Sequence, residues 1–274
     1  MALSNITLTS AMRANVLALQ NNQSLFETTQ NRLATGKKVN TALDDPIAYF
    51  AAKSYTDRAG DLSNLKSDMN EAIQTVQAAN NGITSIQNLV DQAKSIANSA
   101  LASTAAADRS SYAAQFDTVL SQITQVAQDA SYKGTNLLQD GTLTVKFNEG
   151  GTNSLAITGF TASANGTGGL GIATSVSNWS NTSDVSTALS NLNSATTSLR
   201  TQSQNMSGNL AIVNTRLDFT TNMINTLQKG ADNLTLADMN QEGANLLMLQ
   251  TRQSLGTTAL SLASQQAQSV LKLF

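Results

Sequence analysis

Residues 62–100 carry small or apolar side chains at two positions of every heptad, and this repeat constrains the fold more than any other feature. One position holds Leu62, Met69, Val76, Ile83, Val90 and Ala97, and the other holds Leu65, Ala72, Ala79, Ile86, Ala93 and Ala100. A helix with such a repeat hides it by pairing with another helix. The pattern predicts a coiled-coil helix over about residues 47–101, and the alanines at the second position allow close packing.

A similar seam runs through the C-terminal half of the chain. Apolar and small side chains follow alternating steps of three and four residues from Leu189 to Leu227, which predicts a coiled-coil helix over about residues 184–229. Gly230 interrupts this pattern. Thr235 and Asp238 then resemble a capping signal for a final helix that continues to the end of the chain.

The N-terminal end carries a shorter seam of the same kind. The spacing of seven predicts a helix over about residues 9–35, with Gly36 where a helix commonly ends, and its seam residues are Met12, Leu19, Phe26 and Leu33. The single proline, Pro46, follows Asp44 and Asp45. Because a residue before proline is pushed out of helical geometry, we expect a boundary between two parts of the chain here.

The middle of the chain changes from helical to strand periodicity. We expect a shorter third helix capped by Asp108, with an apolar stripe of Tyr112, Phe116, Val119, Ile123 and Val126. Residues 142–160 alternate apolar and polar side chains around a turn at residues 148–151, which predicts a β-hairpin. Residues 161–183 are rich in Gly, Ser, Thr and Asn and are interpreted as a surface loop.

The complete absence of His and Cys excludes most catalytic chemistry. The chain has no thiol nucleophile, no imidazole base and no His/Cys zinc site. The glycine-rich run at residues 165–169 lacks a nucleotide-binding pattern. The neighbouring carboxylates Asp44 and Asp45 are more typical of a turn than of an acid–base pair. We therefore expect no enzymatic activity, no cofactor and no metal ion.

Charge and hydropathy exclude two further kinds of partner. The net charge of −2 argues against nucleic acid, and no stretch approaches the ~18 apolar residues of a membrane span. Residues 1–10 lack the pattern of a cleavable signal peptide. Charged residues make up 12% of the chain, against roughly 25% in a typical domain. Sparse charge favours a subunit that packs against many copies of itself, although an ordinary Ser/Thr-rich secreted protein has the same composition.

Four segments of this sequence, in order, resemble signature segments of bacterial flagellins. The first is residues 31–40 (NRLATGKKVN) with ALDDP at residues 42–46, and the second is residues 79–83 (ANNGI). The third is residues 132–138 (YKGTNLL), and the fourth is residues 259–266 (ALSLASQQ) with VLKLF at residues 270–274. The resemblance covers about residues 1–140 and 184–274, and four ordered segments are far more specific than one.

The resemblance implies a mainly α fold in which long antiparallel coiled-coil helices from both chain ends flank a small β-hairpin region. Residues 1–40 and 235–274 would form the two halves of an inner coiled-coil core. Residues 41–140 would supply N-terminal rod helices, residues 141–183 the hairpin and surface loop, and residues 184–234 a C-terminal rod helix. The larger outer domains of many flagellins are absent from this short middle.

The resemblance also implies a function and partners. Flagellins self-assemble into the extracellular filament used for swimming, and they leave the cell unfolded through the flagellar type III channel without a cleaved signal. Zero cysteines suit that route. Expected partners are other copies of the chain, an export chaperone, the filament cap and the hook–filament junction proteins, with no nucleic acid and no membrane span.

The terminal helices are expected to provide the self-assembly interface, because their apolar side chains have little else to cover them. An isolated helix is marginal in water, so these ends should be mobile in the monomer and ordered in the polymer. The expected interface residues are Leu8, Met12, Val16, Leu19, Phe26, Leu33, Leu246, Leu249, Leu260, Val270 and Phe274.

Three other functions compete with that of a filament subunit. A hook–filament junction protein shares these terminal helices but does not form long fibres alone. An intracellular coiled-coil scaffold has similar periodicity but is not secreted. An enzyme with a helical body would need a catalytic constellation, which this sequence does not offer.

Overall fold

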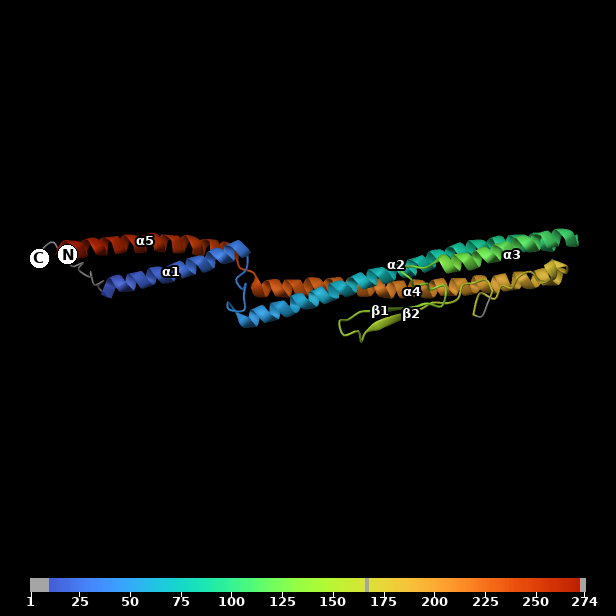
Figure 1. Ribbon diagram of the computed structural model, residues 1–274, viewed down its shortest axis with the longest axis horizontal. Coiled ribbons are helices and arrows are strands. Elements are labelled where there is room, and N and C mark those ends of the chain that lie inside the picture. The colour runs from blue at the N-terminus through green and yellow to red at the C-terminus, as the bar shows by residue number, and fades with distance from the viewer. Residues whose placement is uncertain (1–9, 166–167, 272–274) are drawn as a thin grey trace, which may run out of the picture. The chain divides into compact units, whose positions relative to one another are not determined.

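The computed structural model describes residues 10–165 and 168–271 and confirms the predicted fold class. Five long helices and one hairpin follow in the order α1 (Ser10–Thr35), α2 (Pro46–Ala102), α3 (Ala106–Asp129), β1 (Thr142–Lys146), β2 (Ser154–Thr158), η1 (Val176–Trp179), α4 (Thr182–Thr235) and α5 (Met239–Leu271). Figure 1 shows these elements along the chain. They form two compact units, one of residues up to Asp57 with those from Leu227, and one of Arg58–Thr226.

The second unit is built around the heptad seam of α2. Eleven of the twelve predicted seam residues are buried, and Leu65 is partly buried against the same cluster. The other side of this core comes from α3 and α4, through residues such as Phe116, Leu192 and Leu199. The Lys94 ammonium also donates a hydrogen bond of 2.7 Å to the Thr196 hydroxyl, joining α2 to α4. The period of seven therefore identified the core of this unit.

Gly82 of α2 allows the chain after α3 to pack closely on the coiled coil. A Cβ atom at residue 82 would lie 2.6 Å from Leu138 Cδ1 and 2.8 Å from Ala130 Cβ. Leu138 is fully buried there. Gly82 and Leu138 belong to the second and third flagellin-like segments, so the structure brings these two segments together.

The β-hairpin lies in the same unit. Strand β1 pairs antiparallel with β2, with Leu143 opposite Ile157 and Val145 opposite Leu155. Val145 and Ile157 are buried, while the alternating residues face outward, as the period of two predicted. The Arg58 side chain donates a 2.7 Å hydrogen bond to the Glu149 carboxylate in the turn.

The segment that follows the hairpin is irregular, as expected, but it contributes to the core. Its buried apolar side chains are Ala162, Ala164, Leu170, Ile172 and Trp179. The Trp179 ring lies 4.7 Å from the Phe116 ring, measured between centroids. The Arg109 guanidinium holds the segment in place by donating to the Trp179 carbonyl at 3.0 Å and to the Ser180 carbonyl at 2.7 Å. Part of the expected surface loop is thus packed inside.

Three local predictions about helix ends are corrected. Gly230 does not interrupt the helix, since α4 continues to Thr235, and a Cβ atom at residue 230 would lie at an ordinary contact distance of 3.4 Å from Tyr55 Cδ2. Asp108 does not cap α3; the capping residue is Ala105, without a side-chain bond. Asp238 alone caps α5, accepting the backbone N–H groups of residues 240 and 241.

Candidate functional site: the paired terminal helices

Helices α1 and α5 pack against each other along a seam that is only partly apolar. On α1 the heptad residues Met12, Leu19, Phe26 and Leu33 face this seam, and the second heptad position holds Asn22 and Thr29, which are both buried. Buried polar residues at a heptad position fix the register of two helices at some cost in stability. The pair is therefore specified by polar contacts and stabilised by few apolar ones.

Asn22 makes the central polar contact of the seam. Its side-chain amide donates 3.0 Å to the Leu249 carbonyl and 3.1 Å to the Gln253 side-chain oxygen. The Gln253 amide in turn donates 3.2 Å to the Gln23 side-chain oxygen. These bonds join the two helices at one level, because a shift of one turn would leave the buried Asn22 amide unpaired.

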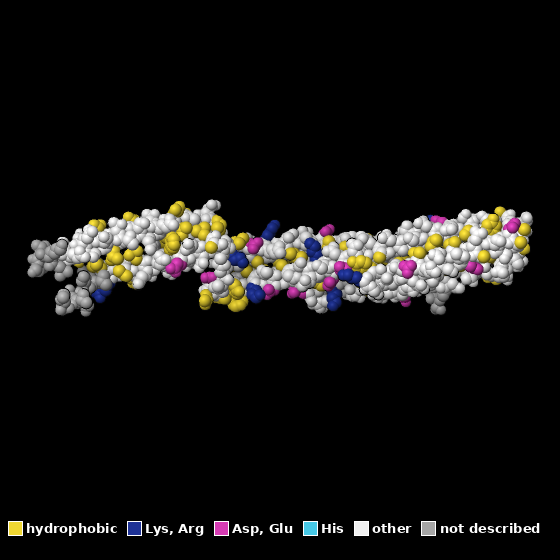
Figure 2. All heavy atoms as spheres, turned by 45° about the horizontal axis from the view of Figure 1, so that its top comes forward, with side chains coloured by type: hydrophobic (Ala, Val, Ile, Leu, Met, Phe, Trp, Pro, Cys, Tyr) yellow, Lys and Arg dark blue, Asp and Glu magenta, His cyan; other side chains and the backbone are white. Residues whose placement is uncertain are grey.

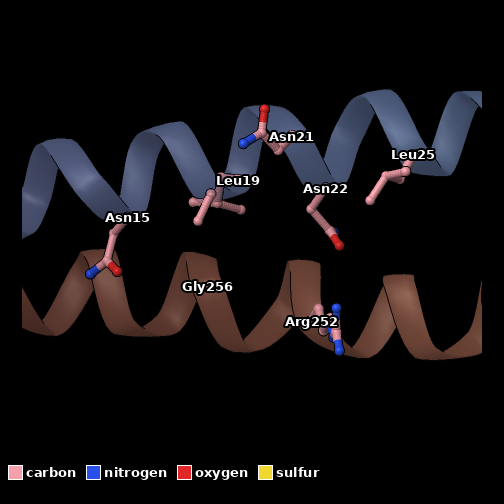
Figure 3. Close-up of a pocket in the computed structure, with 8 residues that line it drawn as sticks. Asn15, Leu19, Asn21, Asn22, Leu25, Arg252 and Gly256 are labelled. Carbon is pink, nitrogen blue, oxygen red and sulfur yellow. The ribbon is translucent and has the colours of Figure 1, made fainter.

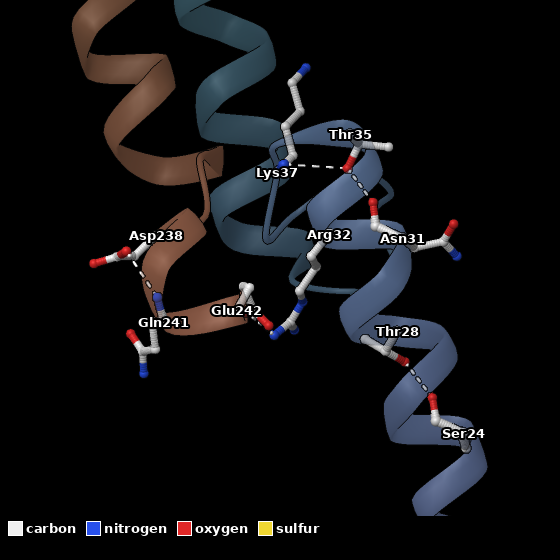
Figure 4. A network of polar contacts seen from close by, with 9 residues as sticks. All are labelled: Ser24, Thr28, Asn31, Arg32, Thr35, Lys37, Asp238, Gln241 and Glu242. Atoms are coloured by element: carbon white, nitrogen blue, oxygen red, sulfur yellow. Dashed lines mark hydrogen bonds and ion pairs between the residues drawn. The ribbon is translucent and has the colours of Figure 1, made fainter. Parts of the chain in front are cut away.

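The seam ends in an ion pair between Arg32 and Glu242, shown in Figure 4. An Arg32 Nη atom lies 3.1 Å from Glu242 Oε1, and the Glu242 side chain is 10% exposed while that of Arg32 is 37% exposed. Glu242 Oε2 is buried and has no hydrogen-bond partner among the described residues. The Arg32 charge therefore compensates a largely desolvated carboxylate in the first turn of α5.

A groove of about 360 Å³ lies between the two helices near Leu19. Figure 3 shows Leu19 and Asn22 of α1 directed toward α5, where Gly256 leaves the helix surface open. A Cβ atom at residue 256 would lie 3.1 Å from Leu19 Cδ2. Leu25 and Arg252 line the groove farther along. Its lining combines apolar side chains with three asparagine amides and the Arg252 guanidinium.

The structure places the expected interface residues mostly inside this seam. Met12 and Leu249 are buried, and those partly buried are Val16, Leu19, Phe26, Leu33, Leu246 and Leu260. Leu8 and Phe274 lie outside the described residues, as does the side chain of Val270. The described members thus help hold α1 and α5 together within one chain, and their role between chains stays a prediction.

A second set of apolar residues lies outside the buried seam on both helices, and one of its members, Leu25, borders the groove. This set, called the outer stripe below, consists of Leu17, Leu25, Leu247, Met248, Leu255 and Leu262. All six are at least 45% exposed, and Leu255 reaches 66%. The sequence carries a signal for this stripe, because three of its members, Met248, Leu255 and Leu262, lie seven residues apart. The prediction of one apolar face per helix did not include it.

The link between α1 and α2 is shaped by two exposed carboxylates. Asp44 Oδ2 accepts the N–H groups of Thr41 and Asn40 at 2.9 and 3.0 Å, and these bonds hold the pKa of Asp44 below its usual range. Asp45 Oδ1 accepts the Ala48 N–H at the start of α2. The Asp-Asp-Pro sequence therefore forms a turn and a helix cap, as the simpler interpretation predicted.

The described residues contain neither a cluster of metal-ligating side chains nor a membrane-spanning helix. Within residues 10–165 and 168–271, no group of three or more acidic side chains converges on a metal-sized site. None of the helices in those ranges is long and apolar enough to cross a membrane.

Comparison with known proteins points to one family. Residues 4–142 match the family described as bacterial flagellin N-terminal helical region. Flagellin FljM of Caulobacter vibrioides is 31% identical over 278 residues, covering 100% of both chains, and the flagellin of Brucella melitensis is 28% identical over 279 residues, covering 98% of both. The crystal structure of Bacillus cereus flagellin aligns with a TM-score of 0.49 at 13% identity, covering 56% of this chain and 88% of that one.

The family match spans half of the chain, and the relatives are similar along its full length. The family match covers the first three signature-like segments, two of which meet at Gly82 and Leu138, and the alignment with the FljM relative covers all four. The chain belongs to the bacterial flagellin family, whose members are structural proteins of the flagellum and not enzymes.

Proposed function

We propose that this chain is the repeating subunit of the extracellular flagellar filament, and that copies bind one another through the outer stripe. The observation that carries this proposal is that α5 has apolar residues on two opposite faces. One face packs on α1, through residues such as Leu249, and the other exposes Leu255 and Leu262. A helix that is apolar on both sides is stable only when both sides are covered.

Neighbouring copies are the natural cover for the outer stripe. Full burial of a Leu or Met side chain gains about 1.5–3 kcal/mol, and six partly exposed side chains on one chain can supply several times that amount when a second chain covers them. The outer stripe of one copy would then pack against apolar side chains of the next copy. Contacts between different patches on successive copies do not close on themselves, so they generate a helical fibre.

The weak seam between α1 and α5 supports ordering of these helices on assembly. Their contact relies on Asn22, Thr29 and Gln253 as much as on leucine, and Gly256 removes one side chain from it. Such a pair is marginal without further burial. We infer that α1 and α5 open frequently in the monomer and become protected in the polymer, which is folding coupled to binding.

Export as an unfolded chain through the flagellar type III route fits this proposal. The chain has no cysteine, so no disulfide obstructs unfolding before passage. An export chaperone would cover the terminal helices inside the cell, and the filament cap and junction proteins would meet the same helices outside it. Each of these partners would contact apolar surface that α1 and α5 expose.

Seeded polymerisation of the purified protein tests the proposed function. Fragments of its own filaments should elongate when monomer is added, followed by light scattering and electron microscopy. Leu255→Asp should stop elongation while leaving the second unit folded, and Leu255→Met should elongate normally. Failure of the unaltered protein to elongate seeds would instead favour a hook–filament junction protein, which caps a fibre without extending it.

A further inference from the structure

A patch at the start of α2 is the most exposed apolar surface in the described chain. Leu43 is 96% exposed, Ile47 is 84% exposed and Phe50 is 62% exposed. Figure 2 shows hydrophobic side chains gathered there beside acidic ones. Asp44 and Asp45 border the patch, and neither carboxylate forms a salt bridge with another described residue. We call these five residues the acidic patch.

The acidic patch is held in a defined shape. The two carboxylates accept backbone N–H groups of the turn and of the first turn of α2. Phe50 packs edge-on against the Tyr49 ring, with centroids 5.5 Å apart. Large side chains fixed at a helix start and left open to solvent mark an interaction site more often than chance exposure does.

A second exposed patch on α4 has the opposite charge. Ile212, Arg216 and Phe219 are spaced four and three residues apart, so they lie on one face of the helix. Ile212 and Phe219 are 47% and 56% exposed. The Arg216 guanidinium lies 5.3 Å from the centre of the Phe147 ring, and it forms no salt bridge with any other described side chain. We call these three residues the basic patch.

The geometry points to docking of the acidic patch of one copy on the basic patch of the next copy, a contact that rests on the proposed polymerisation. Each patch combines two or more exposed apolar side chains with charge of one sign that forms no salt bridge among the described residues, and the two signs are opposite. Opposite potentials on apolar surfaces fix the register of an interface and exclude wrong pairings. Only 12% of the residues in this chain are charged, so the charges at these two apolar patches are a specific feature of the patches and not general surface charge.

The partner is a second copy because both complementary surfaces are present on one chain. Two different patches that bind each other between copies make a head-to-tail contact, which repeats along a fibre without closing. This contact would add to the outer stripe and would explain why Leu43 and Ile47 remain uncovered. Phe50 and Phe219 would be its aromatic anchors, the residue type most enriched at the centres of interfaces.

Crosslinking between two single-cysteine variants tests this contact. Because the natural chain has no cysteine, Ile47→Cys and Phe219→Cys each carry one thiol. Each variant is mixed with unaltered protein, so that filaments form even if the variant assembles poorly alone. Direct disulfides require Cα atoms within about 7 Å, so a bis-maleimide with a longer spacer is used. Filaments that contain both variants should yield a product of twice the single-chain mass, and monomers should not.

The control pairs Ile47→Cys with Ser111→Cys, which places the second thiol on the exposed face of α3 instead of on the basic patch. Its filaments should give little crosslinked product. The docking contact would be overturned if filaments form normally but the Ile47–Phe219 pair gives no more crosslinked product than the control pair. The proposed function would still stand in that case. Absence of any filaments from unaltered protein would contradict the proposed function itself.

Charge reversal gives a second readout. Arg216→Glu should raise the monomer concentration needed for elongation by about tenfold, because two carboxylates would then face a third. Arg216→Lys should keep the charge and stay close to the unaltered protein. Equal elongation by the Glu and Lys variants would contradict the assigned role of Arg216.

Discussion

Leu19 of α1 occupies the space that a side chain at Gly256 of α5 would fill. A Cβ atom at residue 256 would lie 3.1 Å from Leu19 Cδ2 and 3.2 Å from Leu19 Cγ. This contact sets how closely the two terminal helices approach. It also explains why a residue with poor helix propensity is found in the middle of α5.

Gly256→Val should weaken the pairing of α1 and α5 by about 1–3 kcal/mol, because the larger side chain would displace Leu19. Amide hydrogen exchange in the monomer should become faster in both helices. Gly243→Ala is the matched control on the same helix, since a Cβ atom there meets nothing within 4 Å. That change should slow exchange slightly, by the usual gain of Ala over Gly in a helix. Faster exchange in both variants would show that the contact with Leu19 is unimportant.

Arg32→Ala should destabilise the first unit more than a surface ion pair would suggest. Glu242 would then be left desolvated without the charged partner that it has among the described residues, and the partial exposure of Arg32 limits the expected loss to roughly 1–3 kcal/mol. Glu242→Gln removes the buried charge, so adding it to Arg32→Ala should recover part of the loss. Thermal unfolding followed by far-ultraviolet circular dichroism measures both, and a double variant no better than Arg32→Ala would refute this reasoning.

The contacts between α2 and the third signature-like segment should be sensitive to pH in two directions. A hydrogen bond from Lys133 is the largest cause that holds the pKa of Glu71 below its usual range, and a hydrogen bond from Tyr132 is the next largest. The same bond with Glu71 raises the pKa of Lys133. The Glu71 contribution is present above about pH 4.3 and is lost as pH falls through the folded-state pKa. The Lys133 contribution is present below about pH 10.4 and is lost as pH rises through its folded-state pKa.

The single Trp179 gives a convenient measure of this pH dependence, because it is buried in the same unit. Urea unfolding followed by its fluorescence should show a stability plateau between the two limits, with small losses outside it, since the pair is exposed. Glu71→Gln should reduce the loss of stability at both low and high pH. An unchanged profile in that variant would show that other groups control the pH response.

The sequence predicted the helices well because one physical requirement repeats in it. Residues such as Met69 and Ile83 recur every seven positions, so their burial follows from helix geometry alone. Helix ends were predicted less well. Gly230 lies inside α4 although glycine commonly ends a helix, because one glycine costs only about 0.5–1 kcal/mol relative to alanine and the rest of a long helix can offset that loss.

The apolar surfaces of the terminal helices were predicted only in part. The heptad pattern indicated one apolar face of each helix, and the structure shows that this face packs within the chain. The outward face of Leu255 and Leu262 was missed, as were the polar seam residues Asn22 and Thr29. Burial of Trp179 was missed as well, because isolated apolar residues among Gly, Ser and Thr have no period that points to a core.

Amide hydrogen exchange of residues 248–262, compared between monomer and filament, shows whether other copies cover the outer stripe. These amides should exchange several-fold more slowly in filaments, because other copies cover the outer stripe and suppress local opening of α5. Amides of residues 69–97, already protected by the core of the second unit, should change little and serve as the internal reference. Exchange of residues 248–262 at the same rate in filaments and monomers would contradict assembly through the outer stripe.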